Sequence, residues 1–307
     1  MLKKIIFMGT PYFAVPTLKS LYQNGYEISV VYTQPPKKSN RGQKINKSPV
    51  QSLSETLNIE CRTPLSLKNN IEEKKFLQNL NADLAIVVAY GQILESEILG
   101  LTKKGFFNIH ASLLPKWRGA APIQRSIMNL DKKTGLSIMK ITEKLDSGPV
   151  CNSYNLDLLE NENTESLSNR LSLLAAEKIL NDIDAILEDR AVFNNQDDSK
   201  ATYANKILKS EGKIDWSESS KKIIGKINGL YPNCFFIYKG ERYKVLKAEC
   251  SSKTGIIGTI LSNNLEIGCK DGAIKILEIQ KEGKRPQKIN EFVLGSQIKK
   301  GSNLKDA

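Results

Sequence analysis

The sequence predicts an α/β protein in which a doubly wound, mostly parallel sheet is followed by a small β-barrel. Two observations lead to this fold class. Over residues 1–190, short apolar runs typical of buried strands alternate with segments whose apolar residues recur at helical spacing. From residue 205 onward, short strands separated by turn signals replace that pattern, as is typical of small barrels. No apolar run has the length that a membrane-spanning helix needs.

Strands and helices are predicted in alternation along the N-terminal part. The strands are expected within residues 3–9, 26–33, 82–91, 105–111 and 134–141. The helices are expected within residues 15–25, 48–58, 69–80, 121–130 and 164–188. This order indicates a Rossmann-like domain, whose ligands bind beyond the carboxyl ends of the strands.

The polar stretch that follows the last of these helices predicts a linker over residues 191–204. Beyond it, two hairpins are expected, one turning at Lys239-Gly240 and the other at Asp271-Gly272, with a further short strand in residues 255–261. We therefore expect residues 1–190 to form the first domain and residues 205–307 to form an OB-like barrel.

Positive charge is concentrated in the last third of the chain. The formal net charge is +12, and residues 205–307 hold 20 Lys and Arg against 11 Asp and Glu. A general lysine bias would raise both parts alike. The basic C-terminal part therefore predicts a polyanionic partner, most simply a nucleic acid.

The five cysteines are scattered, and no C-x-x-C pair occurs. With a single histidine in the chain, the usual zinc sites cannot be assembled, so no metal is expected. The first residues do not resemble a signal peptide, because no small-residue cleavage site follows the apolar run. These features favour a reducing, cytoplasmic setting.

The only histidine, His110, lies two residues after Asn108 in a predicted strand, so the two side chains leave the same face. An amide and an imidazole at the open end of a strand can both donate to one oxygen, and the imidazole can also transfer a proton. A buried histidine that merely binds a carbonyl is the alternative. Asp146, in a turn-rich stretch after the next strand, is the third candidate. The alternative interpretation of Asp146 is an ordinary turn residue without a catalytic role.

Other catalytic schemes lack their motifs. The sequence contains no G-x-S-x-G, no Walker A motif and no H-E-x-x-H. The segment "MGTPYFAVP" occupies the strand-to-helix turn where dinucleotide-binding folds carry G-x-G-x-x-G, but it holds one glycine. Binding of NAD is therefore not expected.

The segment "NIHASLLPKWRGAAPIQRSI" resembles the signature of the folate-dependent formyltransferases, which share Asn-x-His, Ser-Leu-Leu-Pro and a later Asp. The resemblance covers nearly the whole chain and is greatest to the tRNA-formylating members. It extends over the segments "FMGTPYFAVPTL", "YTQPPKKSNRGQKINKSPV", "VVAYGQIL" and "YANKILKSEGKIDW". It implies transfer of a formyl group from 10-formyltetrahydrofolate, as co-substrate, to the α-amino group of methionyl initiator tRNA for translation initiation.

The resemblance also implies roles for individual residues. Asn108 and protonated His110 would stabilise the charge that builds on the formyl oxygen, and Asp146 would orient the imidazole and favour its protonated form. Folate would be bound by Ser112, Leu113, Leu114 and Pro115, with residues 88–91 as a wall of the same pocket. The first domain would then be catalytic and the second would bind tRNA.

The loop after the second strand is basic. Residues 28–54 hold five basic residues and no acidic one, which a solvated loop does not explain. By the resemblance, this loop enters the acceptor end of the tRNA, where Arg41 recognises the acceptor stem. Lys37, Lys38 and Lys44 would support it.

The sequence departs from the family pattern at Pro36, Lys144, Tyr231 and Asn233. None of these departures removes Asn108, His110 or Asp146.

Two other functions remain open at this point. A formyltransferase for another amine, such as an aminosugar nucleotide, would need the same three residues but neither the basic loop nor the basic barrel. An inactive RNA-binding protein would keep the charge without needing the histidine. We expect a monomer with no membrane partner.

Overall fold

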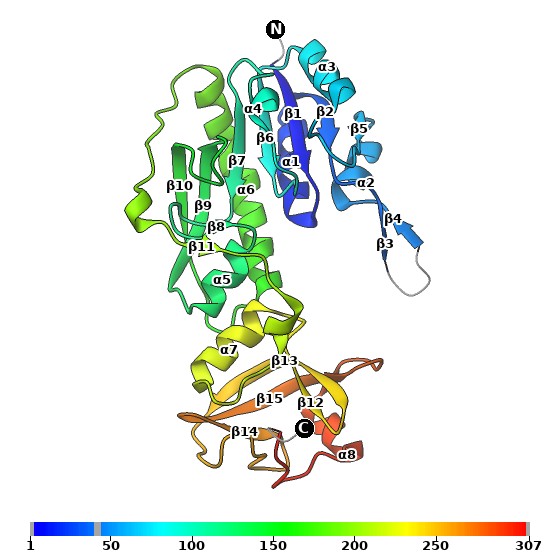
Figure 1. Ribbon diagram of the computed structural model, residues 1–307, viewed down its shortest axis with the longest axis vertical. Coiled ribbons are helices and arrows are strands. Elements are labelled where there is room, and N and C mark those ends of the chain that lie inside the picture. The colour runs from blue at the N-terminus through cyan, green and yellow to red at the C-terminus, as the bar shows by residue number, and fades with distance from the viewer. Residues whose placement is uncertain (1–2, 40–43, 305–307) are drawn as a thin grey trace. The chain divides into compact units, whose positions relative to one another are not determined.

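The computed structural model describes residues 3–39 and 44–304 and divides the chain into two compact units. The N-terminal unit consists of residues 1–119, 133–157 and 168–203, and the C-terminal unit of residues 120–132, 158–167 and 204–307. Figure 1 shows the elements of each unit. No helix within the described ranges is long and apolar enough to cross a membrane.

The N-terminal unit is built on a sheet whose strand order is β10-β9-β7-β6-β1-β2-β5 (Figure 1). Its strands are β1 (Lys4–Gly9), β2 (Glu27–Tyr32), β5 (Cys61–Arg62), β6 (Leu84–Val88), β7 (Phe106–His110), β9 (Lys133–Lys140) and β10 (Val150–Asp157). From β7 to β5, neighbouring strands run parallel, whereas β9 is antiparallel to both β7 and β10. The predicted parallel, Rossmann-like sheet is thus confirmed, with an antiparallel edge that the sequence did not indicate.

Helices cover the sheet. They are η1 (Tyr12–Ala14), α1 (Val15–Gln23), α2 (Pro49–Thr56), α3 (Ile71–Leu80), α4 (Ser96–Leu99) and α6 (Thr164–Leu187). One face packs Ile6 and Met8 of β1 against Leu77 of α3 and Ile98 of α4. Ile5 points to the other face and is equally buried, so both faces are covered, as in parallel sheets generally.

The basic loop carries a short hairpin of β3 (Lys37–Ser39) and β4 (Lys44–Asn46), followed by α2. α2 begins at a capping serine, because the Ser48 hydroxyl accepts from the Gln51 backbone N–H at 2.9 Å. The hairpin was not anticipated from the sequence.

The segment predicted to be a linker lies against the N-terminal unit as far as residue 203. It contains η2 (Asp198–Lys200) and leads into β11 (Tyr203–Ala204), which pairs with β8 (Arg118–Gly119). The ring of Phe193 stacks on Phe107 of β7, with 5.8 Å between ring centroids. The segment therefore has fixed contacts with the N-terminal unit.

The C-terminal unit contains an antiparallel sheet in the order β12-β13-β15-β14, with β16 on β15. Its elements are α5 (Pro122–Met128), η3 (Lys209–Gly212), α7 (Ser220–Gly229), β12 (Phe235–Tyr238), β13 (Glu241–Ser251), β14 (Glu266–Cys269), β15 (Gly272–Lys281), β16 (Gln287–Lys288) and α8 (Ile289–Gly295). The core combines sheet residues such as Phe236 and Ile276 with Ile223 and Ile227 of α7.

The predicted hairpin turn at Lys239-Gly240 is confirmed, and both residues have the positive φ angles, 49° and 74°, that tight hairpin turns require. The second hairpin turns one residue earlier than predicted, at Lys270-Asp271, because Cys269 pairs with Gly272. The prediction of a strand in residues 255–261 is wrong. Thr259 and Ile260 form only isolated bridges, to Asn303 and Ile267.

Candidate functional site

Asn108 and His110 lie on β7, which pairs with β6 on one side and β9 on the other. Because side chains alternate along a strand, both leave the same face, as the sequence predicts. His110 is only 5% exposed, whereas Asn108 is half-buried. The imidazole is therefore shielded from bulk water beside an amide that a ligand can reach.

Asp146 comes from the turn after β9 and brings the three predicted residues together. Its carboxylate accepts from the Asn108 side-chain amide at 3.5 Å and from the Gly119 backbone N–H at 2.8 Å. The oxygen that binds Gly119 also lies 3.6 Å from Nδ1 of His110. Asp146 has a φ of 45°, a left-handed conformation that Asp tolerates better than most residues do.

The other imidazole nitrogen, Nε2 of His110, lies 2.9 Å from the Trp117 carbonyl oxygen. Because a carbonyl oxygen can only accept, Nε2 carries a hydrogen. Nδ1 is then the nitrogen that faces Asp146. Trp117 also has a left-handed φ, 62°, and its backbone N–H donates to the Thr202 hydroxyl at 2.9 Å.

Residues 112–115 leave β7 as a closely bonded segment. The Ser112 hydroxyl donates to the Lys116 carbonyl at 2.6 Å, and the Leu114 backbone N–H donates to the Ser137 hydroxyl at 3.0 Å. The Leu114-Pro115 peptide bond is cis. Leu113 packs directly on Gly135 of β9, where an added Cβ would lie 2.7 Å from the leucine side chain.

The turn at residues 88–91 follows β6, the neighbouring parallel strand. Ala89 and Gly91 have positive φ angles, 49° and 84°. The Thr10 hydroxyl, after β1, donates to the Tyr90 carbonyl at 2.8 Å. The carboxyl ends of β1, β6 and β7 thus meet at one edge, where a parallel α/β sheet binds its ligands.

Residues that the sequence analysis missed support this site. The Arg118 side chain is fully buried, and its guanidinium donates to Gln196 and to Asp198. Hydrogen bonds from Lys144 and Arg118 lower the pKa of the Asp198 carboxyl. Arg118 lies within the recognised signature, which could have drawn attention to it. Gln196 stands in a polar stretch that carries no such signal.

Three of the predicted tRNA-binding residues, Lys37, Lys38 and Lys44, lie on the β3–β4 hairpin. Lys37 is exposed at its start, and Lys38 and Lys44 pair in its two strands with Ile45 and Ser39. Arg41 lies outside the described residues.

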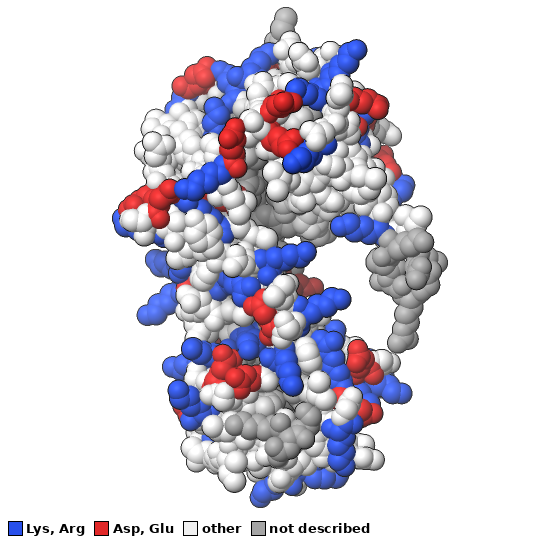
Figure 2. All heavy atoms as spheres, viewed as in Figure 1, with Lys and Arg blue, Asp and Glu red and all other residues white. Residues whose placement is uncertain are grey.

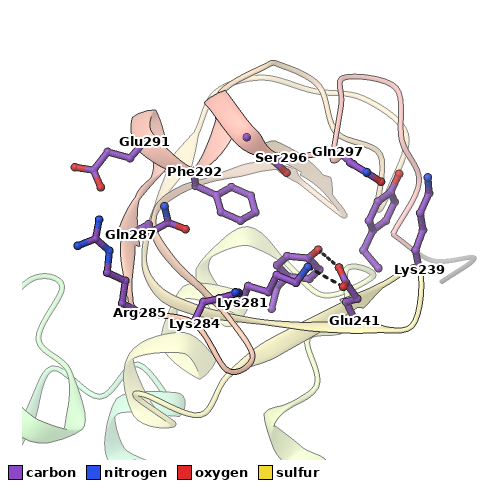
Figure 3. A pocket seen from close by; sticks show the side chains of 13 residues that line it. Lys239, Glu241, Lys281, Lys284, Arg285, Gln287, Glu291, Phe292, Ser296 and Gln297 are labelled. Carbon is purple, nitrogen blue, oxygen red and sulfur yellow. Dashed lines mark hydrogen bonds and ion pairs between the residues drawn. The ribbon is translucent and has the colours of Figure 1, made fainter.

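The C-terminal unit has a hollow of about 670 Å³ next to its hairpin turn, lined by cationic, aromatic and acidic side chains (Figure 3). Lys239, Lys284 and Arg285 provide positive charge there. Lys281 pairs with Glu241 at 2.7 Å, and hydrogen bonds from Lys281 and Tyr243 lower the pKa of that carboxyl. The hollow contains none of the residues predicted to be catalytic.

Within the described ranges, no three His, Cys, Asp or Glu side chains cluster in a way that could hold a metal ion.

Comparison with known proteins first defines a class. Residues 3–183 match the family model for formyl transferase, and residues 206–297 match the model for the formyl transferase C-terminal domain. The methionyl-tRNA formyltransferase of Pelagibacter ubique is 63% identical over 99% of both chains, and that of a Jannaschia species is 42% identical over 98% of this chain and 99% of the relative. The chain therefore belongs to the methionyl-tRNA formyltransferase family.

A more distant solved structure has the same fold. It is an N-formyltransferase from Helicobacter canadensis, in complex with folinic acid and dTDP-3-aminofucose, with a TM-score of 0.66 and 19% identity. The match covers 92% of this chain and all of that one.

Proposed function

We propose that the protein transfers the formyl group of 10-formyltetrahydrofolate to the α-amino group of methionyl initiator tRNA and so provides N-formylmethionyl-tRNA for translation initiation. One observation carries this proposal. In a chain 63% identical to a methionyl-tRNA formyltransferase, the Asp146 carboxylate lies within 3.6 Å of both Asn108 and His110.

In the proposed reaction, the neutral amine attacks the formyl carbon and negative charge builds on the formyl oxygen. The Asn108 amide has a second N–H beside the one that donates to Asp146, and this N–H can bind that oxygen. For His110 to donate to the same oxygen, Nε2 must give up its hydrogen bond to the Trp117 carbonyl and donate to the formyl oxygen instead. These donors stabilise the tetrahedral intermediate.

Completion requires a proton transfer. As the new C–N bond forms, the amine loses a proton, and as the bond to folate N10 breaks, N10 gains one. His110 moves this proton through Nδ1, the nitrogen that carries no hydrogen in the neutral ring, and the Asp146 carboxylate beside it stabilises the imidazolium that forms in between. No net charge is gained or lost by the protein over the cycle.

Folate binding is assigned to the segment of Ser112, Leu113, Leu114 and Pro115, with the turn at residues 88–91 as a second wall. The support is their position at the carboxyl ends of β7 and β6. The internal hydrogen bonds of residues 112–116 hold the segment in one shape, so its apolar side chains need little ordering when the ligand binds.

Binding of tRNA is assigned to Lys37, Lys38, Arg41 and Lys44 of the basic loop and to the C-terminal part. Figure 2 shows Lys and Arg side chains spread over the visible face of the C-terminal unit. The hollow of Figure 3 adds cations beside aromatic side chains, a combination suited to phosphates and bases. We assign catalysis to residues 1–190 and tRNA binding to residues 205–307, joined by residues 191–204. We expect the reaction to be cytoplasmic and the enzyme to be a monomer.

The direct test is formyl transfer from 10-formyltetrahydrofolate to charged methionyl initiator tRNA, with an aminosugar nucleotide as the control acceptor. The expected result is rapid formylation of the tRNA and none of the sugar. Preferential formylation of the sugar would refute the assigned acceptor, and transfer to neither would refute the proposed activity.

A further inference from the structure

Two side chains hold the turn that carries Asp146 from outside. Asp198 accepts from the Lys144 side chain at 2.8 Å, and Gln196 binds the backbone of the turn. The Gln196 amide nitrogen donates to the Asp146 carbonyl at 2.9 Å and to the Gly148 carbonyl at 2.7 Å. Both N–H groups of this amide are thus used on the backbone on either side of Ser147. Gln196 lies 50 residues further along the chain than Asp146, in the segment predicted to be only a linker.

Gln196 is itself fixed by Arg118. Its side-chain oxygen accepts from Nε and Nη2 of Arg118 at 3.0 and 2.9 Å, and Nη2 also donates to Asp198 at 2.7 Å. Arg118 itself is fully buried, whereas Asp198 is 58% exposed. Every hydrogen-bonding position of the Gln196 amide therefore has a protein partner, and its orientation is set by the direction of the guanidinium donors.

The turn needs such support because of its conformation and surroundings. Asp146 has a left-handed backbone, which costs about 1 kcal/mol or more and persists only where its surroundings hold it. Glu143, Lys144 and Leu145, just before it, are exposed and contribute little packing, and the Lys144 side chain is held through its ion pair with Asp198. Gly148 packs so tightly on the Lys140 carbonyl that no Cβ fits there. Because this end of the turn cannot move, a distortion of the turn would displace Asp146 instead.

We propose that Gln196, aimed by Arg118, is a positioning residue for the reaction, one that holds the Asp146 carboxylate against Asn108 and His110. This inference rests on the proposed function of the three residues. Gln196 touches no reacting group and acts through the backbone of the turn. A displacement of about 1 Å in a catalytic group can lower a rate by up to roughly 100-fold, so the effect should be measurable.

Gln196→Glu keeps the contacts at one end of the side-chain amide and removes those at the other. The carboxylate keeps, and strengthens, the contact with Arg118, whereas it has no N–H to offer the carbonyls of Asp146 and Gly148. We expect kcat for methionyl-tRNA to fall roughly 10–100-fold, the usual effect of losing a residue that orients a functional group. The KM values for methionyl-tRNA and for 10-formyltetrahydrofolate should each stay within about twofold of the parent. Gln196→Met, which removes both polar ends without adding charge, should behave similarly.

The decisive measurement is a double-mutant cycle with Asp146→Asn. If Gln196 acts through Asp146, adding Gln196→Glu to the Asp146→Asn enzyme should lower kcat by less than about twofold, because the carboxylate it positions is already gone. The matched control is Asp197→Asn, next to Gln196, which keeps an acceptor oxygen for Ser199 and loses only the charge that pairs with Lys200. Its kcat should stay within about twofold of the parent.

Three outcomes would overturn the proposal. The first is a kcat for Gln196→Glu within twofold of the parent. The second is that Gln196→Glu lowers kcat as much in the Asp146→Asn enzyme as in the parent. The third is that lost folate binding or unfolding explains the lower kcat of both Gln196 variants. The parent enzyme in the same assay keeps this test separate from that of the proposed function. If it failed to formylate methionyl-tRNA, the function would be refuted rather than the role of Gln196.

Discussion

One carboxylate oxygen of Asp146 lies 3.6 Å from Nδ1 of His110, while Nε2 of the same ring donates to the Trp117 carbonyl. Nε2 is thus fixed by a hydrogen bond, and Nδ1 lies beside the carboxylate. The same Asp146 oxygen accepts from the Gly119 backbone at 2.8 Å, which fixes the carboxylate independently of the ring.

Asp146→Asn should lower kcat at least 100-fold with little change in folate binding. The amide is isosteric, but it removes the negative charge that stabilises the imidazolium, and its NH₂ cannot accept from Gly119. Single-turnover formylation over a range of pH measures the effect. The control Asp157→Asn, at the exposed end of β10, should retain full activity. Full rate with an unaltered pH profile in Asp146→Asn would leave Asp146 as an ordinary turn residue.

His110→Ala should lower kcat by roughly 10²–10⁴-fold, the usual contribution of a positioned acid–base group. Because the ring is 5% exposed, its removal leaves a small cavity, and thermal unfolding should show a modest loss of stability. Folate affinity, measured by titration, should be nearly unchanged. Near-normal turnover would be incompatible with the proposed proton transfer.

The sequence was sufficient to predict the pair on β7, because the two-residue period of a strand places Asn108 and His110 on one face whatever surrounds them. It could not predict the antiparallel direction of β9, since the apolar pattern of a buried strand is the same in both directions. Arg118 and Gln196 were missed for a different reason. They are 78 residues apart, and their contact exists only once the polar segment folds back onto β7.

Arg62→Met should destabilise the N-terminal unit and reverse one component of its pH dependence. Burial would raise the pKa of Glu73, but hydrogen bonds from Arg62 and Tyr32 outweigh it and hold the pKa below its usual value. In the parent, this stabilisation is present above the unfolded-state pKa and is lost as the pH falls. Without Arg62, burial dominates, so stability should instead increase between pH 7 and pH 5.

Urea unfolding at several pH values tests this reversal. The loss at pH 7 should be about 3 kcal/mol, because a largely buried carboxylate loses its cation, while the methionine can still pack on Phe76 in place of the guanidinium. Lys74→Met, which breaks the exposed pair of Lys74 with Glu97, is the control and should change stability by less than about 0.5 kcal/mol. Parallel pH profiles for the parent and Arg62→Met would refute the prediction.

Lys284→Ala should weaken the binding of all tRNAs about equally and should reduce the slope of log K against log salt by about one. Lys284 lines the basic hollow of the C-terminal unit. Lys275→Ala, on β15, is the matched control. Lys275 pairs with Glu249 at 3.0 Å, so it should neutralise no phosphate, and its loss should leave the slope unchanged. Filter-binding titrations at several salt concentrations distinguish the two. Equal slopes for both variants would remove the hollow from the tRNA-binding surface.

Arg41→Ala should reduce discrimination between tRNAs more than affinity. The basic loop is expected to become ordered against the acceptor stem, and binding energy realised only in that seated state can hold the aminoacyl end against the formyl donor. The variant should therefore lose more kcat/KM with initiator tRNA than with a poor elongator substrate. Lys38→Ala, another substitution in the basic loop, should lower both about equally, as expected for a residue that contacts only phosphate.

The ratio of kcat/KM between initiator and elongator methionyl-tRNA is the quantity that decides the role of Arg41. It should be measured at fixed ionic strength, because lost phosphate contacts alone can imitate a specificity defect when the salt concentration varies. A ratio that narrows for Arg41→Ala but not for Lys38→Ala assigns acceptor-stem recognition to Arg41. If the ratio is the same in Arg41→Ala and the parent, the loop attracts tRNA by charge alone, and discrimination must arise elsewhere in the enzyme.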